Sequence, residues 1–310
     1  MIDIFHSTNA ATDLKQLEKA KTGSWVHVVE PSEQELFILC NDYDLELDLL
    51  KDATDIYETP RVERDGGNTY VFARYCYPKG VDIATEPILI VYTKNNLITI
   101  QRRRTPILDR IISGSEPVAT TQKTKTFLQI LSAINSSYER HMYSVNKHII
   151  GLRGKLSKTD IKNEYFIEFI DIEENLNEYL TALQPQSAMY KSLLNGRFLP
   201  LYEADKDLVE DLLLTTTELI DLIKSRIKTI SNIRDAYSTI MANNLNRIFK
   251  RLTSIGIFLT IPTIIASLYG MNVRLPGVGG DTTTAFWEIM VIIIISTAGV
   301  TYLFKKLKWF

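Results

Sequence analysis

Two long uncharged segments near the C-terminus constrain this chain more than any other feature. No charged residue occurs between Leu252 and Val273, and a second apolar run extends from Ile289 to Phe304. An α-helix needs about 20 apolar residues to cross the hydrocarbon core of a bilayer. The chain is therefore predicted to be a large soluble domain followed by a two-span membrane anchor.

The rest of the chain has the composition of a soluble protein. The 310 residues are 45% hydrophobic and 23% charged, but most of the apolar excess lies in the C-terminal segment. Nothing before Leu252 approaches a transmembrane run, and the start Met1–Ile4 lacks the basic and apolar regions of a signal peptide. We therefore expect most of the mass to stay in the cytoplasm.

Basic residues flank both apolar runs on the side away from the short connecting segment. Lys and Arg mark the cytoplasmic ends of membrane spans, and a two-span hairpin requires the same arrangement. We therefore expect a multi-pass protein of the cell (inner) membrane with both termini in the cytoplasm. The flanking residues are Arg247, Lys250 and Arg251 before the first run and Lys305, Lys306 and Lys308 after the second, whereas the connecting segment carries Arg274, Asp281 and Glu288.

Several function classes have no support in the sequence. The two cysteines, Cys40 and Cys76, do not make a disulfide framework, and both are predicted to be buried thiols. His141 and His148 share a predicted helix, but no Cys/His cluster supports a zinc site. The three arginines at 102–104 are expected to be solvated surface rather than a nucleic-acid contact, because the net charge is −2. No phosphate-binding loop, nucleophile elbow or metalloprotease motif is present, so neither ATP-driven transport nor an enzyme is predicted.

The N-terminal third is predicted to be a mixed α/β fold. Ser32 and Glu35 have the spacing of a capping box that opens a helix. Gly114 and Pro117 suggest a linker over residues 113–121. The predicted strands and their turns alternate along this region, with strands at 25–29, 69–77, 88–93 and 97–101, turns at 65–68 and 94–96, and a second short helix at 45–56.

After this linker the apolar pattern becomes helical, with a period near 3.6 residues. Helices are predicted at 123–152 and 160–194, and Gln184–Pro185 is expected to kink or break the second. One unbroken helix is predicted from Glu203 to Tyr269, about 100 Å long at about 1.5 Å per residue. A monomer cannot bury such a helix, so it should pack against copies of itself and against the two preceding helices.

These patterns divide the chain into six segments. A cytoplasmic α/β domain and a set of long helices come first, and two membrane spans with their loop and tail follow. The predicted bounds are 1–120 for the α/β domain, 121–250 for the long helices, 251–272 for the first span, 273–285 for the outer loop, 286–305 for the second span and 306–310 for the basic tail.

Small and polar residues form a stripe on the first predicted span. Their spacing places them on one helix face. One interpretation is that small residues let helices pack closely in lipid. The other is that several copies surround a water-filled path, along which an ion moves partly hydrated because the stripe has no acidic residue. The stripe consists of Thr253, Gly256, Thr260, Thr263, Ser267 and Gly270, and it continues backwards to Phe249 and Asn246.

Gly270, Met271 and Asn272 follow this face at its outer end. Glycine permits backbone geometry that other residues resist, and the asparagine side chain and nearby carbonyls offer oxygen acceptors. A ring of such oxygens suits a hard cation that keeps its water shell. Mg²⁺ is such a cation, since it prefers octahedral oxygen ligation and holds its waters.

Motifs at both ends of the chain occur together in one order. They are Trp25–Val26, Pro31–Leu36, Asp52 and Pro60–Glu63 near the N-terminus, and Tyr269–Asn272, the final span and the basic-aromatic tail Lys305–Phe310 near the C-terminus. In order, spacing and topology they resemble the CorA family of magnesium transporters over most of the chain. The resemblance implies an α+β cytoplasmic domain with an α/β/α-type sheet. It also implies a very long stalk helix, continuous with the first of two transmembrane helices, in a homopentameric funnel-shaped channel.

The resemblance also implies roles for individual residues. Five first spans would line the pore, and the second spans would form an outer ring. Asp52 and Asp211 fall where family members place a sensor for divalent cations between subunits, although ordinary solvated carboxylates are an alternative interpretation. The other positions are the selectivity motif Gly270, Met271 and Asn272, the polar pore positions Asp235 and Asn246, the hydrophobic constriction at Phe249 and Leu252, and the pore-lining Thr253, Gly256, Thr260 and Thr263.

Two features depart from the family. Arg274 puts a positive charge beside the motif, where the outer loop is often acidic, so a strong attraction of cations by this loop is in doubt. Thr260 stands where methionine is common, so the constriction is expected to be more polar.

The resemblance therefore implies a passive channel for Mg²⁺, driven by the membrane potential, with Co²⁺ and Ni²⁺ as further candidates. Cytoplasmic Mg²⁺ bound between subunits is expected to close it. The expected partners are copies of the chain, the lipid bilayer and divalent cations, with no organic cofactor and no nucleic acid. Two alternatives remain: a Zn²⁺-selective relative in the same family, and a membrane-anchored sensor that transports nothing.

Overall fold

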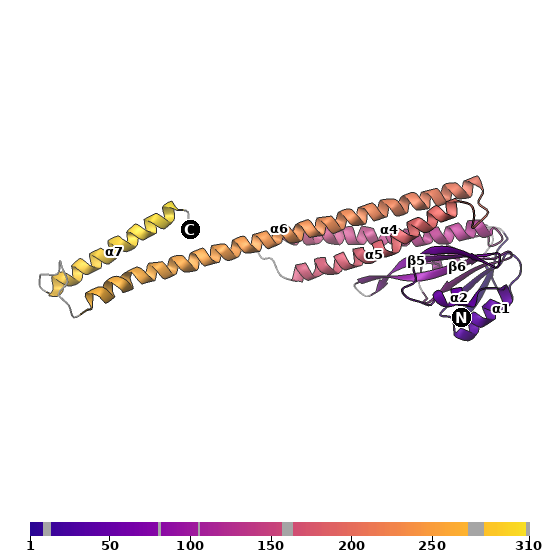
Figure 1. Cartoon of the computed structure of the whole chain (residues 1–310), viewed down its shortest axis with the longest axis horizontal. Helices are drawn as coiled ribbons and strands as arrows, with labels where there is room; N and C mark the ends of the chain where they lie inside the picture. Colours follow the sequence, from indigo (N-terminus) through magenta and orange to yellow (C-terminus); the bar gives the residue numbers. More distant parts are fainter. Residues whose placement is uncertain (9–13, 80–81, 105, 157–163, 272–281, 308–310) are drawn as a thin grey trace. The chain divides into compact units, whose positions relative to one another are not determined.

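The structure is a computed structural model that describes residues 1–8, 14–79, 82–104, 106–156, 164–271 and 282–307 (Figure 1). The chain divides into two compact units, Met1–Ser231 and Asn232–Phe310. The first unit has a mixed sheet between two layers of helices. The second has the C-terminal part of one long helix and a final apolar helix.

A seven-stranded sheet organises the first unit, in the order β2-β1-β3-β7-β6-β5-β4. Strands β3 and β7 pair in parallel, and the other neighbouring pairs are antiparallel. Every residue of β3 and β7 is buried, as expected for strands that are covered on both faces. The strands are β1 (Ile2–His6), β2 (Lys15–Leu17), β3 (Trp25–Val29), β4 (Arg61–Asp65), β5 (Asn68–Lys79), β6 (Asp82–Tyr92) and β7 (Leu97–Gln101).

Both predicted turns join neighbouring strands. Gly66 and Gly67, between β4 and β5, have φ angles of 55° and 87°. A tight two-residue hairpin needs two positive φ values, and glycine adopts them without strain. Tyr92 of β6 pairs with Leu97 of β7 across the second turn. Strands β2 and β4 lie outside the predicted strands because they are edge strands with polar sequences, which lack apolar alternation.

Helices α1 (Glu33–Tyr43) and α2 (Leu47–Asp52) cover one face of the sheet. The capping box predicted at Ser32 and Glu35 is confirmed in both directions. The prediction that the second helix reaches residue 56 is wrong. Here Asp55 donates its N–H to the Asp52 carbonyl in a tighter turn, which ends the helix. The core beneath these helices consists of Val26, Val28, Leu36, Leu39, Leu45, Leu50, Ala53, Tyr70, Phe72, Leu89, Val91, Ile98 and Ile100.

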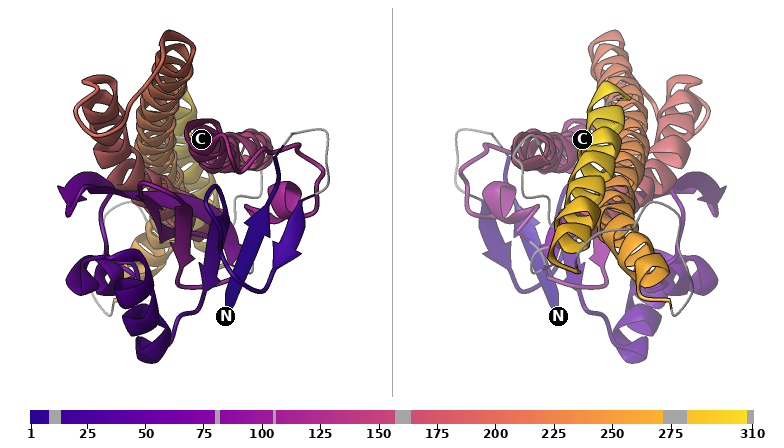
Figure 2. Two further views of the ribbon diagram at one scale, coloured as in Figure 1. Left: turned by 90° about the vertical axis from the view of Figure 1, so that its right-hand side faces the viewer. Right: turned by 90° about the vertical axis from the view of Figure 1, so that its left-hand side faces the viewer.

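Helices α4 (Lys123–Leu156) and α5 (Glu164–Leu194) cover the other face, where they contact β4, β5 and β6. Figure 2 shows the sheet between the indigo α1 and α2 and the magenta to pink α4 and α5. The short helix α3 (Asp109–Ile112) precedes the predicted linker. Of the kink or break expected at Gln184–Pro185, the break does not occur, because α5 continues through Pro185. The next residue, Gln186, is buried and hydrogen-bonded, which holds this turn of the helix in place.

Helix α6 (Glu203–Tyr269) is a single helix of 67 residues, as predicted. Its first part packs in the first unit through buried residues such as Val209, Leu212 and Ile223. Beyond Ser231 most of its side chains are exposed in the single chain. Helix α7 (Thr282–Lys306) follows, and its helical structure begins four residues before the predicted start of the second span at 286.

Candidate functional site

Two segments are long and apolar enough to cross a membrane. They lie in α6 and at Phe286–Lys306 of α7, and each has a mean hydropathy of 1.8 in its apolar window. Only 6% and 0% of these windows are buried inside the chain. Core helices of soluble proteins would be buried, so these exposed apolar surfaces fit a lipid environment.

The stripe on α6 presents hydrogen-bond acceptors. The Thr260 hydroxyl donates to the Gly256 carbonyl across 2.8 Å, and the Thr263 hydroxyl donates to the Leu259 carbonyl across 2.8 Å. Each hydroxyl uses its one hydrogen inside the helix, so its lone pairs remain available on the outer side. Thr260 and Thr263 are exposed and line an open groove with Ser267. This face can accept hydrogen bonds from water, including the water shell of a cation.

Helix α6 ends at Tyr269, directly before the glycine of the outer motif. The Gly270 N–H donates to the Ala266 carbonyl across 3.0 Å, and the Met271 N–H approaches the Leu268 carbonyl at 3.4 Å. A Cβ atom on Gly270 would lie 3.3 Å from the Ala266 oxygen, so glycine allows a close approach rather than a left-handed turn. Met271 is 53% exposed. Asn272, the third residue of the motif, lies outside the described residues.

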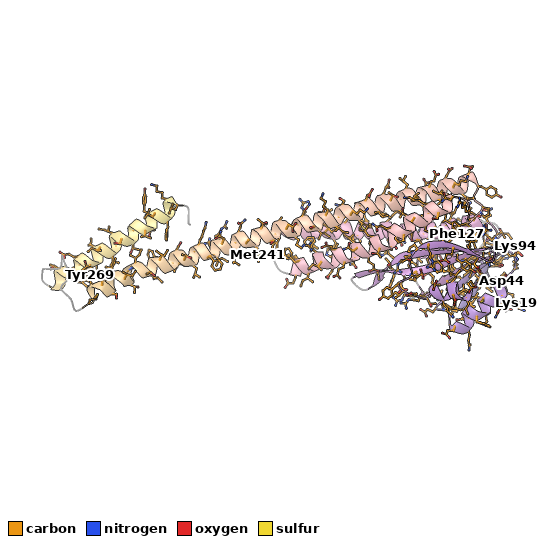
Figure 3. The ribbon with its side chains drawn as sticks, in the orientation of Figure 1. Lys19, Asp44, Lys94, Phe127, Met241 and Tyr269 are labelled. Atoms are coloured by element: carbon orange, nitrogen blue, oxygen red, sulfur yellow. The ribbon has the colours of Figure 1, made fainter. Side chains whose placement is uncertain are left out.

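The candidate pore residues nearer the cytoplasm also lie on exposed surface of α6. Asp235 and Asn246 are exposed. Phe249 and Leu252, the predicted constriction, are 58% and 64% exposed. Figure 3 labels Met241 and Tyr269 on this helix. In the sequence, all four candidate positions lie between Ser231 and Thr253. Large apolar side chains that are this exposed in a single chain are typical of a surface that is buried against another molecule or against lipid.

Asp52 is the last residue of α2, and its carboxylate contacts Arg61 at the start of β4. The Asp52 Oδ2 to Arg61 Nη2 distance is 2.8 Å, and the two side chains are 43% and 28% exposed. Glu58 and Glu63 also contact the same guanidinium, which lies 4.0 Å from the centre of the Phe72 ring. Asp52 is thus partly exposed and already paired with a positive charge.

The second sensor candidate, Asp211, is exposed on α6. Among the described residues, no group of three His, Cys, Asp or Glu side chains is placed to hold a metal ion within one chain. A cation at Asp52 or Asp211 would therefore take its other ligands from water or from another copy. These hard oxygen donors fit Mg²⁺, which usually binds through one or two carboxylates and keeps several waters.

A buried polar network connects the sheet to α6. The Asn135 amide on α4 donates to the Thr216 hydroxyl on α6 across 3.0 Å. On α5, the Tyr190 hydroxyl and the Gln186 amide donate to the Asn135 carbonyl oxygen at 3.0 and 3.2 Å. The backbone N–H of Arg74, on β5, donates to Gln186 Oε1 across 3.1 Å. No sequence motif indicates this network. The available signal in the sequence is weak: polar residues such as Asn135 and Gln186 stand beside the apolar stripes of their helices.

The remaining thiols and histidines do not form a shared metal site. Cys76 is buried, and its burial raises the pKa of the thiol to about 12. Its Sγ lies 3.2 Å from His141 Nδ1. His148 instead contacts Glu168 at 3.1 Å, so the two histidines have separate partners. The prediction of a buried thiol is confirmed for Cys76, whereas Cys40 is only half-buried.

The arginine run at 102–104 is not simply solvated. Arg102 pairs with Glu86 at 3.0 Å, and the Glu86 side chain is 1% exposed. This hydrogen bond raises the pKa of Arg102. Arg103 lies over the ring of Tyr77 at 5.3 Å. The expectation of solvated surface is wrong for Arg102, because a buried carboxylate needs a paired charge.

The sequence profile of the family described as CorA-like Mg²⁺ transporter protein matches residues 20–306. The chain belongs to this family. As a CorA-family protein it is a divalent cation transporter of a membrane, and the family is one of transporters rather than enzymes.

Known proteins of similar sequence and fold agree with this assignment. The chain is 25% identical over 292 residues to the cobalt/magnesium transport protein CorA of Methanocaldococcus jannaschii, with 92% of this chain and 90% of the relative covered. It is 23% identical over 261 residues to the zinc transport protein ZntB of Pectobacterium atrosepticum, with 81% and 76% covered. The complete structure of the CorA magnesium transporter from M. jannaschii matches with a TM-score of 0.87 at 20% identity, covering 100% of this chain and 99% of that chain. The predicted CorA fold of a mixed sheet with helices, a long helix and two apolar C-terminal helices is thereby confirmed.

Proposed function

We propose that the chain forms a homopentameric channel through which Mg²⁺ passes into the cell, with Co²⁺ and Ni²⁺ as further cargo. The polar face of α6 is the observation that carries this proposal. Thr260 and Thr263 present acceptor lone pairs there, and Gly270 and Met271 of the outer motif follow the end of α6 at Tyr269. The waters around a hydrated cation can donate to such acceptors. A relative that is a cobalt/magnesium transport protein supports this choice of ions.

A single copy of α6 cannot enclose a path, so the channel needs several copies. The exposed Phe249 and Leu252 are apolar surface that copies of the chain would bury. In the proposed assembly, 251–272 line the pore, 286–305 form an outer ring and 273–285 lie outside. The α/β domain (1–120), the long helices (121–250) and the tail (306–310) lie in the cytoplasm, so both termini are cytoplasmic.

The membrane potential is sufficient to drive uptake without a nucleotide. A potential of about 100 mV is worth about 2.3 kcal/mol for each elementary charge. A divalent ion therefore gains roughly 4.6 kcal/mol, which supports an inward gradient on the order of a thousandfold. Passive uptake on this scale needs a means of closing the channel when the cell is replete.

Asp52 and Asp211 of neighbouring subunits supply the proposed means of closing. They would hold a regulatory Mg²⁺, largely through its waters, and its charge would offset the facing carboxylates. Without that charge the carboxylates repel each other, the subunits shift, and the ring at Phe249 and Leu252 widens. A hydrophobic constriction gates by dewetting, so a small change in width is enough.

Uptake by liposomes tests the proposal directly. Purified full-length protein is placed in liposomes that contain a Mg²⁺-sensitive dye, under an inside-negative potential. We expect rapid Mg²⁺ uptake that is lost in Asn272→Ala. Absence of uptake by the parent protein, with its oligomer intact, would contradict the channel and would favour the membrane-anchored sensor.

The zinc transport relatives favour a second candidate, a Zn²⁺ transporter. Zn²⁺ prefers thiolate and imidazole ligands, whereas the stripe on α6 consists of hydroxyl-bearing residues and glycine. The pore face therefore favours Mg²⁺. Competition among Mg²⁺, Co²⁺, Ni²⁺ and Zn²⁺ in the same liposomes decides between the two, since preferential Zn²⁺ uptake would support the second candidate.

A further inference from the structure

Arg61 lies against the proposed regulatory carboxylate Asp52, and any regulatory role of Arg61 rests on the proposed function of that carboxylate. We propose that Arg61 is a built-in counter-cation of Asp52, with which a regulatory divalent cation competes. Arg61 thereby sets the Mg²⁺ concentration at which the transporter closes. Removing its charge should let the transporter close at lower Mg²⁺.

The guanidinium of Arg61 is held by contacts at all three of its nitrogens. Nη2 donates to Asp52 Oδ2 across 2.8 Å, Nη1 contacts Glu58, and Nε contacts Glu63. The Phe72 ring supports it from one side, 4.0 Å from the guanidinium carbon. Such a planar fork, stacked on an aromatic ring, fixes the position of the positive charge.

The net charge of this cluster matches that of one divalent cation. Three carboxylates surround one guanidinium, so the cluster keeps two negative charges when all four groups are ionised. Asp52 and Glu63 are 43% and 42% exposed, whereas Glu58 is 12% exposed. An arriving cation therefore has direct access to Asp52.

The fixed positive charge opposes that arrival in two ways. One oxygen of Asp52 is already engaged by Arg61, and the cation itself is repelled by the guanidinium a few ångströms away. For a divalent ion near the protein surface, removing one such charge should change the half-saturating concentration by about tenfold, after screening by salt.

A merely structural role makes a different prediction. Arg61 also joins the end of α2 to β4, so its loss could loosen this part of the fold. Lysine keeps the positive charge but loses the planar fork. If the fork were what matters, Arg61→Lys and Arg61→Gln would have the same effect. If the charge matters, only Arg61→Gln changes the Mg²⁺ dependence.

The test uses the full-length protein and two readouts. The first is the Mg²⁺ concentration that gives half of the Mg²⁺-dependent rise in unfolding temperature in detergent. The second is the internal Mg²⁺ concentration that halves uptake by liposomes. The matched control is Arg64→Gln, which removes the same charge from the same strand. The Arg64 guanidinium donates to the Arg197 carbonyl at 3.1 Å instead of to a carboxylate.

We expect both concentrations to fall about tenfold in Arg61→Gln, and to stay within about threefold of the parent in Arg61→Lys and Arg64→Gln. Arg61→Met, which keeps an apolar chain over Phe72, repeats the measurement if Arg61→Gln does not fold. Unchanged or increased concentrations in the neutral variants would overturn the proposal, as would equal shifts in Arg61→Lys.

A further variant separates this inference from the proposed function. Asp52→Asn with Asp211→Asn removes the sensor carboxylates themselves. If this double variant keeps the Mg²⁺ dependence of the parent, the sensor is wrong, and the counter-cation proposal falls with it. If it loses that dependence while Arg61→Gln behaves like the parent, the sensor stands and the role of Arg61 is wrong.

Discussion

Asn135 on α4 donates a hydrogen bond to the carbonyl of Leu212 on α6, across 3.0 Å in a buried setting. Arg74 of β5 extends this link, through Gln186, to the loop between α2 and β4. The Arg74 Nη1 donates to the carbonyls of Ile56 and Glu58, each at 2.8 Å. A chain of hydrogen bonds therefore connects the loop that follows Asp52 with the helix that continues into the membrane. It offers a physical route by which a shift at the loop biases α6.

This network predicts a large loss of stability for Asn135→Leu. The change removes the buried acceptor of the Tyr190 hydroxyl and the Gln186 amide, which should lower the free energy of unfolding by about 2–4 kcal/mol. Denaturant unfolding of the purified protein measures it. Asn177→Leu, at an exposed position of α5, is the control and should change stability by less than about 0.5 kcal/mol. Equal losses in both variants would mean that the network contributes little.

The acceptor face of α6 predicts a loss of transport in Thr260→Val. Valine keeps the shape of threonine but removes the oxygen, at a cost of about 1 kcal/mol for one hydrogen bond. We expect Mg²⁺ uptake by liposomes to fall about fivefold. Thr301→Val on α7 is the matched control, because the Thr301 hydroxyl donates to the Thr297 carbonyl across the same 2.8 Å. A similar fall in the control would place the effect in helix packing rather than in the pore.

The sensor carboxylates predict a transporter that no longer closes in Asp52→Lys with Asp211→Lys. Lysine puts a fixed positive charge where the regulatory cation would bind. We expect this double variant to take up Mg²⁺ at internal concentrations that shut the parent. Asp48→Lys is the control, since Asp48 is an exposed carboxylate of the same helix. The sensor mechanism is wrong if the double variant closes at the same Mg²⁺ concentration as the parent.

The long helix and the membrane spans could be predicted because their signals are local. The 3.6-residue apolar period and the absence of Gly and Pro between Tyr202 and Gly256 can be read directly from the local sequence. The break expected at Pro185 fails because local rules omit the hydrogen bonds of Gln186. Tertiary contacts of this kind override local preference.

The contacts of the candidate site could not be predicted from the sequence. Asp52 stands among many acidic residues, and no local pattern shows that Arg61 is the positive charge that meets it. The spacing on α6 did reveal the polar face. It could not show that the Thr260 hydroxyl turns its hydrogen inward, because this depends on the side-chain torsion angle. The role of Asn272 stays a prediction.

His27 predicts a loss of stability in mild acid. Burial, with a contribution from Arg104, lowers the pKa of His27 from 6.5 to about 4. The indole N–H of Trp25 donates to the Thr99 hydroxyl oxygen across 2.9 Å. The hydroxyl hydrogen of Thr99 is therefore free to be donated to His27 Nδ1, which lies 2.9 Å away. This arrangement suits the neutral ring. The unfolded chain therefore binds a proton first, as the pH falls below about 6.5.

The stability that neutral His27 contributes is complete above a pH of about 6.5 and falls until the pH reaches about 4. The loss should reach about 3 kcal/mol, because the ring is almost fully buried. Unfolding temperatures between these two pH values measure it. His27→Gln should flatten the pH dependence, whereas His148→Gln, at an exposed position, should leave it steep. A parent protein with a flat profile would contradict the assignment.

Cys76 predicts that one of the two thiols is unreactive in the folded protein. Burial raises the pKa of Cys76 to about 12, and only the thiolate reacts with alkylating reagents. At a pH of about 8 roughly one molecule in ten thousand carries that thiolate. We expect iodoacetamide to label the half-buried Cys40 in the folded protein and to label Cys76 only in denaturant.

Peptide mass spectrometry separates the two positions, and Cys40→Ser provides a folded protein whose remaining thiol is Cys76. The Cys76 N–H donates to the Ser137 hydroxyl of α4 across 3.3 Å, so the thiol lies where the sheet meets this helix. Labelling of Cys76 therefore requires that β5 and α4 separate. If Cys40→Ser is labelled as fast as the parent, the contact between sheet and helix opens readily, and the link from the loop near Asp52 to α6 is not rigid.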